Sequence, residues 1–298
     1  MRIALLTAVL ALGIAAGAPA VIIDSGDGTG NTTAPVPDPG WRNIGEISGR
    51  SGVYLGGRFA LTAHHVGPGS IVLDGVTYVY VPGTAVQLDN GDGTWADLVM
   101  FQIHPAPPLP ALAIASVSPP EGTAMILTGR GVDRGPATSF DPNAADPPPP
   151  VFGYEWGAGH AKRWGTNSAA GALRIDLIDG TQTLSILTRF DPAGSAHEAQ
   201  AAAGDSGGAA FAWNGSQWQL AGILFAVGAS YTDQPPETSL YGNLTLCADL
   251  SAYRAQILDV MALPEPRGGI YAGALITALL ARVSRARLQS PPRSSTRA

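Results

Sequence analysis

The chain has 298 residues, of which 45% are hydrophobic and 13% charged, so it can bury the core of one large domain or two small ones. Its 38 glycines and 25 prolines predict many turns and argue against an architecture of long amphipathic helices. The net charge of −6 argues against a nucleic-acid partner, because a phosphate-binding surface needs clustered Lys and Arg.

Residues 1–20 have the pattern of a secretory signal peptide. Arg2 provides the positive charge, and Ile3–Ala16 is an apolar stretch of suitable length. Ala18 and Ala20 put small residues at the third-last and last positions before a cleavage site. We therefore expect export, with a mature chain that begins directly after Ala20. A buried N-terminal helix is the alternative.

Residues 21–40 are predicted to form an irregular lead-in, because they are rich in Gly, Asp, Thr and Pro. Asp24, Asp27 and Asn31 suggest a calcium loop. However, they lack the regular alternation and the closing Glu of an EF-hand. Turn formation is the better account of these three residues.

From Trp41 onward, short apolar segments are separated by Gly, Pro, Asp or Asn. This pattern is typical of all-β sandwiches and barrels. Residues 89–93 predict a turn between strands rather than a metal site, and residues 251–261 have helical spacing. Examples of the predicted strands are 52–55, 71–73, 77–81, 98–103, 124–128, 173–177, 184–188, 209–213 and 220–227.

Cys247 is the single cysteine, so no intrachain disulfide can form and packing must stabilise the fold. It lies in the apolar run 244–250, which predicts a small buried side chain rather than a nucleophile. His104, His160 and His197 have no paired ligand spacing, so we expect structural or surface histidines and no metal.

The strongest catalytic signal is the segment 204–208, Gly-Asp-Ser-Gly-Gly, which precedes an apolar strand. The hydroxyl of Ser206 is a poor nucleophile that needs a base to take its proton and donors for the oxyanion it creates. The flanking glycines allow a tight turn in which backbone N–H groups point to one spot. A glycine-rich turn that merely contains a serine is the alternative.

Two further segments could supply the partners of such a serine. His64 and His65 follow the apolar stretch 60–63, and Asp97 opens the apolar stretch 98–101. A buried aspartate is costly unless a partner compensates its charge. Taken singly, such a histidine is more often structural, and such an aspartate is more often a turn residue at a strand end.

Together the three segments resemble the chymotrypsin family of serine proteases. Residues 62–65, Thr-Ala-His-His, resemble the family's Thr-Ala-Ala-His strand end, and residues 97–100, Asp-Leu-Val-Met, resemble its Asp-Ile-Ala-Leu. Residues 204–208 match its Gly-Asp-Ser-Gly-Gly unchanged, and the order His, Asp, Ser also agrees. The resemblance implies a peptidase domain over residues 41–262, built as a chymotrypsin-like double six-stranded β-barrel with a C-terminal helix.

The resemblance also implies the roles of the site residues. Ser206 would be the nucleophile, His65 its base and Asp97 the residue that orients the base. His65 rather than His64 takes this role, because the family places one small residue between Thr-Ala and the histidine. The backbone N–H groups of Gly204 and Ser206 would form the oxyanion hole, and no cofactor is implied.

Counting back from Ser206 places the base of the substrate pocket at Gln200. Phe225 and Val227 lie on the strand that the family uses to bind substrate backbone, although this chain lacks the family's usual Ser-Trp-Gly there. No acidic residue lies among residues 200–203, which disfavours cleavage after Arg or Lys. We expect a preference for small or apolar residues, and the natural substrate stays open.

Many family members need a freed N-terminal amine that pairs with the aspartate before the catalytic serine, here Asp205. Cleavage after Ala20 would free Val21 for this role. Residues 24–39 are unlike the family's usual start, so the partner of Asp205 stays open.

Residues 263–288 resemble the PEP-CTERM sorting signal of Gram-negative bacteria. They combine a Pro-Glu-Pro motif, an apolar stretch at 268–283 and several arginines, and residues 289–298 form a polar tail. The resemblance implies transient membrane anchoring, processing by an exosortase, and a final location at the cell surface or in the extracellular matrix. An amphipathic surface helix is the alternative.

Three functions therefore compete. The leading one is an exported serine endopeptidase that acts on protein or peptide substrates. The second is a non-catalytic surface or matrix binding protein on the same fold. The third is a serine esterase of the α/β-hydrolase type, whose Gly-x-Ser-x-Gly pattern also fits residues 204–208; that fold places its histidine after the serine, and no histidine follows Ser206.

Overall fold

The computed structural model describes residues 21–142, 149–159, 161–177 and 179–263. The expected signal peptide 1–20, the sorting segment 263–288 apart from its first residue, and the tail 289–298 lie outside these residues. The described residues from Val21 to Met261 form one compact unit, and Ala262 and Leu263 lie outside it. Within the described ranges, no helix is both long and apolar enough to cross a membrane.

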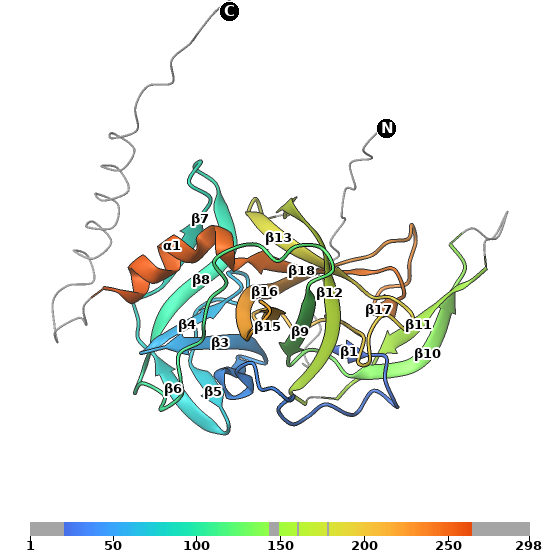
Figure 1. Cartoon of the computed structure of the whole chain (residues 1–298), viewed down its shortest axis with the longest axis horizontal. Helices are drawn as coiled ribbons and strands as arrows, with labels where there is room; N and C mark the ends of the chain where they lie inside the picture. The colour runs from blue at the N-terminus through green and yellow to red at the C-terminus, as the bar shows by residue number, and fades with distance from the viewer. Residues whose placement is uncertain (1–20, 143–148, 160, 178, 264–298) are drawn as a thin grey trace, which may run out of the picture. The chain divides into compact units, whose positions relative to one another are not determined.

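The first barrel is built from antiparallel strands that follow a short 3-10 helix, η1 (Trp41–Asn43). Six strands pair in the order β4-β3-β2-β5-β6-β8, the pairing of β4 with β8 closes the ring, and β7 pairs with β8 outside it (Figure 1). The strands are β2 (Ile44–Ile47), β3 (Arg50–Gly56), β4 (Phe59–Thr62), β5 (Ile71–Leu73), β6 (Val76–Tyr80), β7 (Val86–Asp89) and β8 (Trp95–His104).

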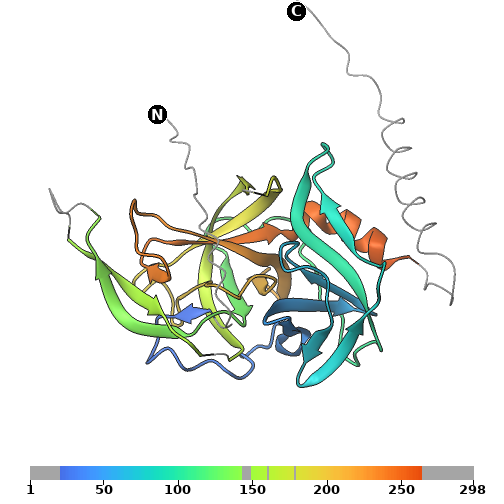
Figure 2. The same ribbon diagram turned by 180° about the vertical axis from the view of Figure 1, so that it is seen from behind.

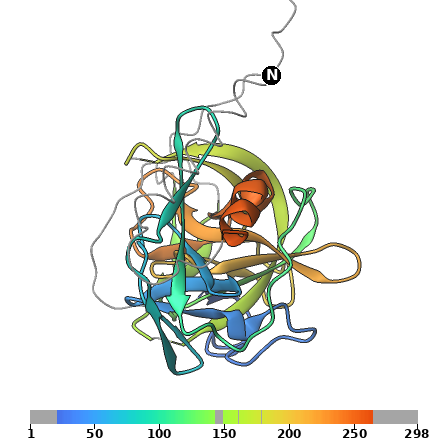
Figure 3. The same ribbon diagram turned by 90° about the vertical axis from the view of Figure 1, so that its left-hand side faces the viewer.

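The second barrel closes in the order β12-β13-β18-β16-β15-β9. Helix α1 (Leu250–Met261) follows its last strand and lies beside the first barrel, as Figure 3 shows. The strands are β9 (Ala124–Gly129), β12 (Arg163–Asp176), β13 (Gln182–Arg189), β15 (Ala209–Trp213), β16 (Trp218–Gly228) and β18 (Leu244–Asp249).

Two small sheets accompany the second barrel. Strand β1 (Ile22–Ile23) pairs with β14 (Ala199–Gln200). A three-stranded sheet of β10 (Arg134–Phe140), β11 (Val151–Trp156) and β17 (Thr238–Leu240) extends to one side (Figure 1).

The lead-in 21–40 is held to the second barrel by long-range hydrogen bonds. The guanidinium of Arg163 donates to the carbonyls of Thr29 and Gly30, and the indole N–H of Trp164 donates to the carbonyl of Thr33 at 2.8 Å. These bonds satisfy backbone groups that an irregular segment cannot pair within itself.

The hydrophobic core is continuous across both barrels and α1. Along β8, Leu98 and Met100 face a cluster that includes Phe211 of the second barrel and Tyr253 of α1. Phe101 faces the opposite way, into a second cluster. Because both faces are buried, β8 is apolar along most of its length. Burying one such side chain contributes roughly 1.5–3 kcal/mol.

The expected architecture is confirmed. The described residues form an almost entirely β structure with two closed six-stranded barrels and one C-terminal α-helix. Each of the nine predicted strands overlaps an observed strand, and the predicted helix 251–261 lies within α1. The predicted turn 89–93 connects β7 to β8.

Candidate active site

His65 and Asp97 form a hydrogen-bonded pair at the ends of neighbouring strands. Thr62 at the end of β4 is paired with Val99 of β8, so the turn after β4 carries His65 to the start of β8. The Nδ1 atom of His65 lies 2.6 Å from Oδ2 of Asp97, and the backbone N–H of His65 donates to Oδ1 at 2.9 Å. Both carboxylate oxygens therefore bind the same residue.

This pairing fixes the state of the imidazole ring. A carboxylate only accepts hydrogen bonds, so Nδ1 of His65 is the donor in this contact, which selects the tautomer in which Nε2 is the acceptor. Asp97 is fully buried, whereas the side chain of His65 is 29% exposed. The exposed ring can therefore meet a second group while the buried carboxylate holds it in place.

The turn 204–208 is shaped by its own hydrogen bonds and by strand β16. The N–H groups of Gly207 and Gly208 each donate at 2.7 Å, to the carbonyls of Leu224 and Asp205. The N–H of Leu224 returns a bond to the carbonyl of Gly208 at 2.8 Å. The turn is thereby fixed against the strand that follows β15.

Two backbone N–H groups of this turn have no acceptor among the described residues. Within the part of the chain that the structure describes, the N–H groups of Gly204 and Ser206 donate to no protein acceptor. Gly204 has φ of 90°, a conformation that glycine adopts without strain. Two unpaired donors beside a serine could stabilise a developing oxyanion.

Ser206 is tied to the first barrel through Ser51 of β3. The N–H of Ser51 donates to the carbonyl of Ser206 at 3.0 Å, and the hydroxyl of Thr62 donates to the carbonyl of Ser51 at 2.8 Å. Because Thr62 is three residues before His65, these bonds place the backbone of Ser206 beside the end of β4. Gly207 has φ of 86°, and a Cβ atom there would overlap the Ser51 carbonyl and the Thr62 hydroxyl.

The structure thus joins His65 directly to Asp97 and connects the backbone of Ser206, through Ser51, to the end of β4. Ser206 is half-buried, and among the described residues its hydroxyl forms no hydrogen bond, including none to His65. Such bonds are often long in empty sites and shorten when substrate binds. His64, by contrast, is partly exposed in the same turn and has no hydrogen bond to Asp97.

Asp205 is completely buried next to the candidate nucleophile. Its carboxylate accepts the N–H of Gly131 at 2.6 Å and the N–H of Ala202 at 2.8 Å. Burial nevertheless raises the pKa of Asp205 to about 7, because these two bonds only partly replace the lost water. No cation among the described residues forms an ion pair with it.

The start of the described chain runs beside the segment that leads to Asp205. Val21 is fully buried, and Ile22 is paired with Gln200 across the β1–β14 sheet. The side chain of Val21 packs in a hydrophobic cluster with second-barrel residues such as Leu127 and Leu224 rather than lying in solvent.

The three residues expected in the substrate pocket differ in their surroundings. Gln200 is only 2% exposed, and its Oε1 atom has no hydrogen-bond partner among the described residues. Phe225 is packed in the main core cluster, and Val227 is half-buried beside a second cluster. The N–H of Ala201 donates to the hydroxyl oxygen of Thr245 at 2.9 Å.

Cys247 is buried as expected, and burial raises the pKa of its thiol. His104 is exposed, and His197 contacts Ser25 and the Trp164 ring, so both are accounted for without a ligand. His160 lies outside the described residues. Over the described ranges, no three His, Cys, Asp or Glu side chains are grouped as metal ligands.

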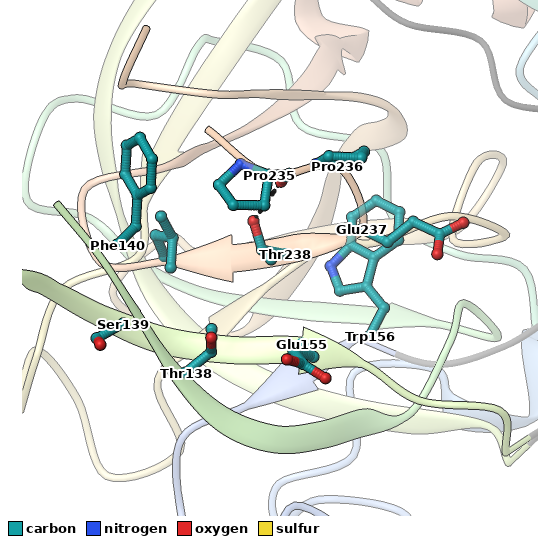
Figure 4. A pocket seen from close by; sticks show the side chains of 10 residues that line it. Thr138, Ser139, Phe140, Glu155, Trp156, Pro235, Pro236, Glu237 and Thr238 are labelled. Carbon is teal, nitrogen blue, oxygen red and sulfur yellow. Dashed lines mark hydrogen bonds between the residues drawn. The ribbon is translucent and has the colours of Figure 1, made fainter. Parts of the chain in front are cut away.

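Two cavities lie elsewhere on the second half of the chain. One, of about 260 Å³, opens over the three-stranded sheet between Phe140, Trp156 and the loop 235–237 (Figure 4). The other, of about 480 Å³, is bordered by β12, β13 and the loop after β13. Neither cavity is lined by His65, Asp97 or Ser206.

The chain is similar to solved structures of serine proteases. Neuropsin, a serine protease expressed in the limbic system of mouse brain, is 16% identical, with a TM-score of 0.51 over 78% of this chain and 99% of neuropsin. The active form of the Rv3671c protease from M. tuberculosis is 16% identical, with a TM-score of 0.44 over 76% of this chain and 77% of that protein. The inactive form of the Rv3671c protease is 17% identical, with a TM-score of 0.44 over 74% of this chain and 90% of that protein.

At such identities the likeness concerns the fold alone, and the neuropsin match shows that this chain has a chymotrypsin-like fold. No protein-family model and no curated protein sequence matches the chain.

Proposed function

We propose that this chain is an exported serine endopeptidase that cleaves peptide bonds through an acyl-enzyme formed on Ser206. The observation that carries the proposal is the His65–Asp97 pair, in which both carboxylate oxygens bind one histidine whose ring is still exposed. The free N–H groups of the neighbouring turn add to it. The chymotrypsin-like fold is consistent with this function but does not by itself establish it.

In the proposed mechanism, Nε2 of His65 takes the proton of Ser206 while Oγ attacks the scissile carbonyl. Asp97 holds the ring in the tautomer with Nδ1 protonated and stabilises the imidazolium that forms. The N–H groups of Gly204 and Ser206 donate to the oxyanion. Loss of one such donor typically costs about a hundredfold to a thousandfold in rate.

His65 then returns the proton to the departing amine, and water, activated by the same ring, releases the acyl group from Ser206. These steps need no metal or other cofactor, since the acid, the base and the nucleophile are all side chains of the chain itself. We propose proteins or peptides as substrates because residues 62–65, 97–100 and 204–208 resemble the motifs of the chymotrypsin family.

The substrate pocket is proposed at Gln200, Phe225 and Val227. Residues 199–203 contain no acidic side chain, so nothing there would favour Arg or Lys at the cleaved bond. We propose a preference for small or apolar residues, and cleavage of a peptide library by the purified protein tests it. Dominant cleavage after Arg or Lys would contradict it.

The proposed location rests on the two ends of the sequence. The pattern of residues 1–20 supports export, and that of 263–288 supports transient anchoring, exosortase processing and a final place at the cell surface or in the extracellular matrix of a Gram-negative bacterium. Fractionation of the host and terminal sequencing of the mature protein test this. A cytoplasmic chain that retains both ends would contradict it.

The enzymatic proposal is tested with a fluorophosphonate probe, which labels activated serines. We expect labelling of the wild type, none of Ser206→Ala, and a fall of at least about a thousandfold in rate for His65→Ala. His64→Ala is the matched control, because His64 is adjacent but does not contact Asp97. An unlabelled but folded wild type would favour the non-catalytic binding protein instead.

A further inference from the structure

The backbone N–H of Asp97 stands at a gap in the strand pairing of β8. On one side, the pairing of β8 with β4 ends at Val99 opposite Thr62, two residues beyond Asp97. On the other side, the pairing with β7 shifts register between Gln87 and Asp89. Asp97 therefore has no partner in either ladder, although it is completely buried. A buried N–H without an acceptor is disfavoured, so another group has to satisfy it.

Thr183 of the second barrel fills this gap. Its Oγ1 atom accepts the N–H of Asp97 at 2.9 Å, and Thr183 is itself completely buried. Thr183 is paired with Ile175 across the β12–β13 hairpin, so this side chain is carried by a regular strand rather than by a loop. The bond joins β8, the strand that bears Asp97, to the second barrel.

The residues on both sides of Thr183 are also fixed. The carbonyl of Gln182 accepts the side-chain amide of Asn90 at 2.6 Å, and the N–H of Leu184 donates to the hydroxyl of Tyr253 at 2.9 Å. That hydroxyl in turn donates to Oδ1 of Asn90 at 2.8 Å. Figure 2 shows the β12–β13 hairpin beside the β7–β8 hairpin that carries Asn90. The segment of β13 that carries Thr183 is thus held by hydrogen bonds on both sides of Thr183.

Asp97 is in this way held from two directions. Its carboxylate binds His65 within the first barrel, and its backbone binds Thr183 of the second. We propose that Thr183 is a positioning residue, whose hydroxyl sets the place of Asp97 and through it the orientation of His65. Its effect on turnover rests on the proposed function, whereas the contact itself does not.

Kinetics of three variants test the role. Thr183→Val keeps the shape of the side chain but removes the acceptor, so we expect kcat to fall about tenfold to a hundredfold with KM changed less than about twofold. Thr183→Ser, which restores the acceptor, should recover most of the rate. Thr188→Val is the matched control: Thr188 is equally buried on the same strand, and its hydroxyl has no partner among the described residues.

A second readout does not depend on catalysis. Hydrogen exchange of the Asp97 amide, followed by NMR, should be slow in the wild type and at least about tenfold faster in Thr183→Val, with no change in Thr188→Val. The downfield resonance of the His65 Nδ1 proton should shift in Thr183→Val alone. Purely structural loss of packing would affect neither signal selectively.

The outcomes separate the two proposals. If the wild type is active, and folded Thr183→Val keeps the wild-type kcat and the wild-type exchange rate of the Asp97 amide, the role of Thr183 is overturned. The peptidase proposal then remains intact. An inactive wild type overturns the peptidase proposal, and the exchange data still decide the contact. If Thr183→Val does not fold, fast exchange of Asp97 in the folded wild type, or a wild-type kcat for Thr183→Ala, overturns the inference.

Discussion

The partner of Asp205 can be tested by adding one residue to the N-terminus. A chain that begins at Val21 would carry its charged amine into the region beside β14, where Val21 is completely buried. Asp205 is fully buried and accepts the N–H groups of Gly131 and of Ala202, which is two residues after the β1 partner Gln200. It has no ion pair with a cation among the described residues. We predict that a chain beginning at Val21 is active, and that a single glycine placed before Val21 strongly lowers activity by displacing the amine.

The magnitude follows from the pKa of Asp205, which burial raises from 3.8 to about 7. The shift is about 3 units, and each unit corresponds to about 1.36 kcal/mol, so an unpaired Asp205 carboxylate costs roughly 4 kcal/mol above pH 7. Between the two pKa values the folded state keeps a proton that the unfolded state has released. The free energy of unfolding therefore falls as pH rises from about 4 to about 7. An ammonium group beside Asp205 would lower this pKa and remove the fall.

The assay is urea unfolding at pH 4 and pH 8, together with the rate of fluorophosphonate labelling at pH 8. Between pH 4 and pH 8, the free energy of unfolding of the extended chain should fall by up to about 4 kcal/mol more than that of the chain beginning at Val21. The labelling rate of the extended chain at pH 8 should be up to about a thousandfold lower than that of the chain beginning at Val21. In an Asp205→Asn background the extension should no longer alter the pH dependence. Equal pH dependence and equal labelling of the two chains would refute the reasoning.

Two further predictions concern residues beside the site and in the core. Gly207→Ala should abolish labelling and destabilise the fold by at least about 2 kcal/mol more than Gly215→Ala. Both glycines have positive φ, but of the two only Gly207 faces backbone atoms that a Cβ atom would overlap. Equal losses of the free energy of unfolding in urea would contradict this prediction. Cys247 should resist alkylation at pH 8 in the native protein and react fully in denaturant, because burial raises the pKa of its thiol; rapid native alkylation would contradict it.

The sequence predicts strands well where a strand is apolar and ends in turn residues. Strands β5 and β15 have the predicted bounds, because their apolar residues are flanked by Gly, Asp or Asn. The first part of β12 escapes prediction, because its inward positions include Arg163 and Asn167. Their polarity is tolerated only because distant carbonyls, such as those of Gly30 and Ala199, accept their hydrogen bonds. No local pattern reveals such partners.

The candidate site likewise contains some residues that the sequence predicts and others that it does not. Residues 204–208, His65 and Asp97 stand in short motifs whose chemistry is visible in the sequence. Thr183 and Ser51 do not, because each acts through hydrogen bonds to residues far away in the chain. A threonine in such a strand has the same local pattern whether its hydroxyl binds the candidate aspartate, as at Thr183, or has no partner among the described residues, as at Thr188.

These two unpredicted bonds are related by the way the barrels meet. His65 and Asp97 are carried by the first barrel and Ser206 by the second. Ser51 of the first barrel binds the backbone of Ser206, while Thr183 of the second binds the backbone of Asp97. Each barrel therefore holds a backbone group of the segment that the other contributes. A relative shift of the barrels would strain both bonds at once, so the geometry of the candidate triad and the packing of the two barrels are coupled.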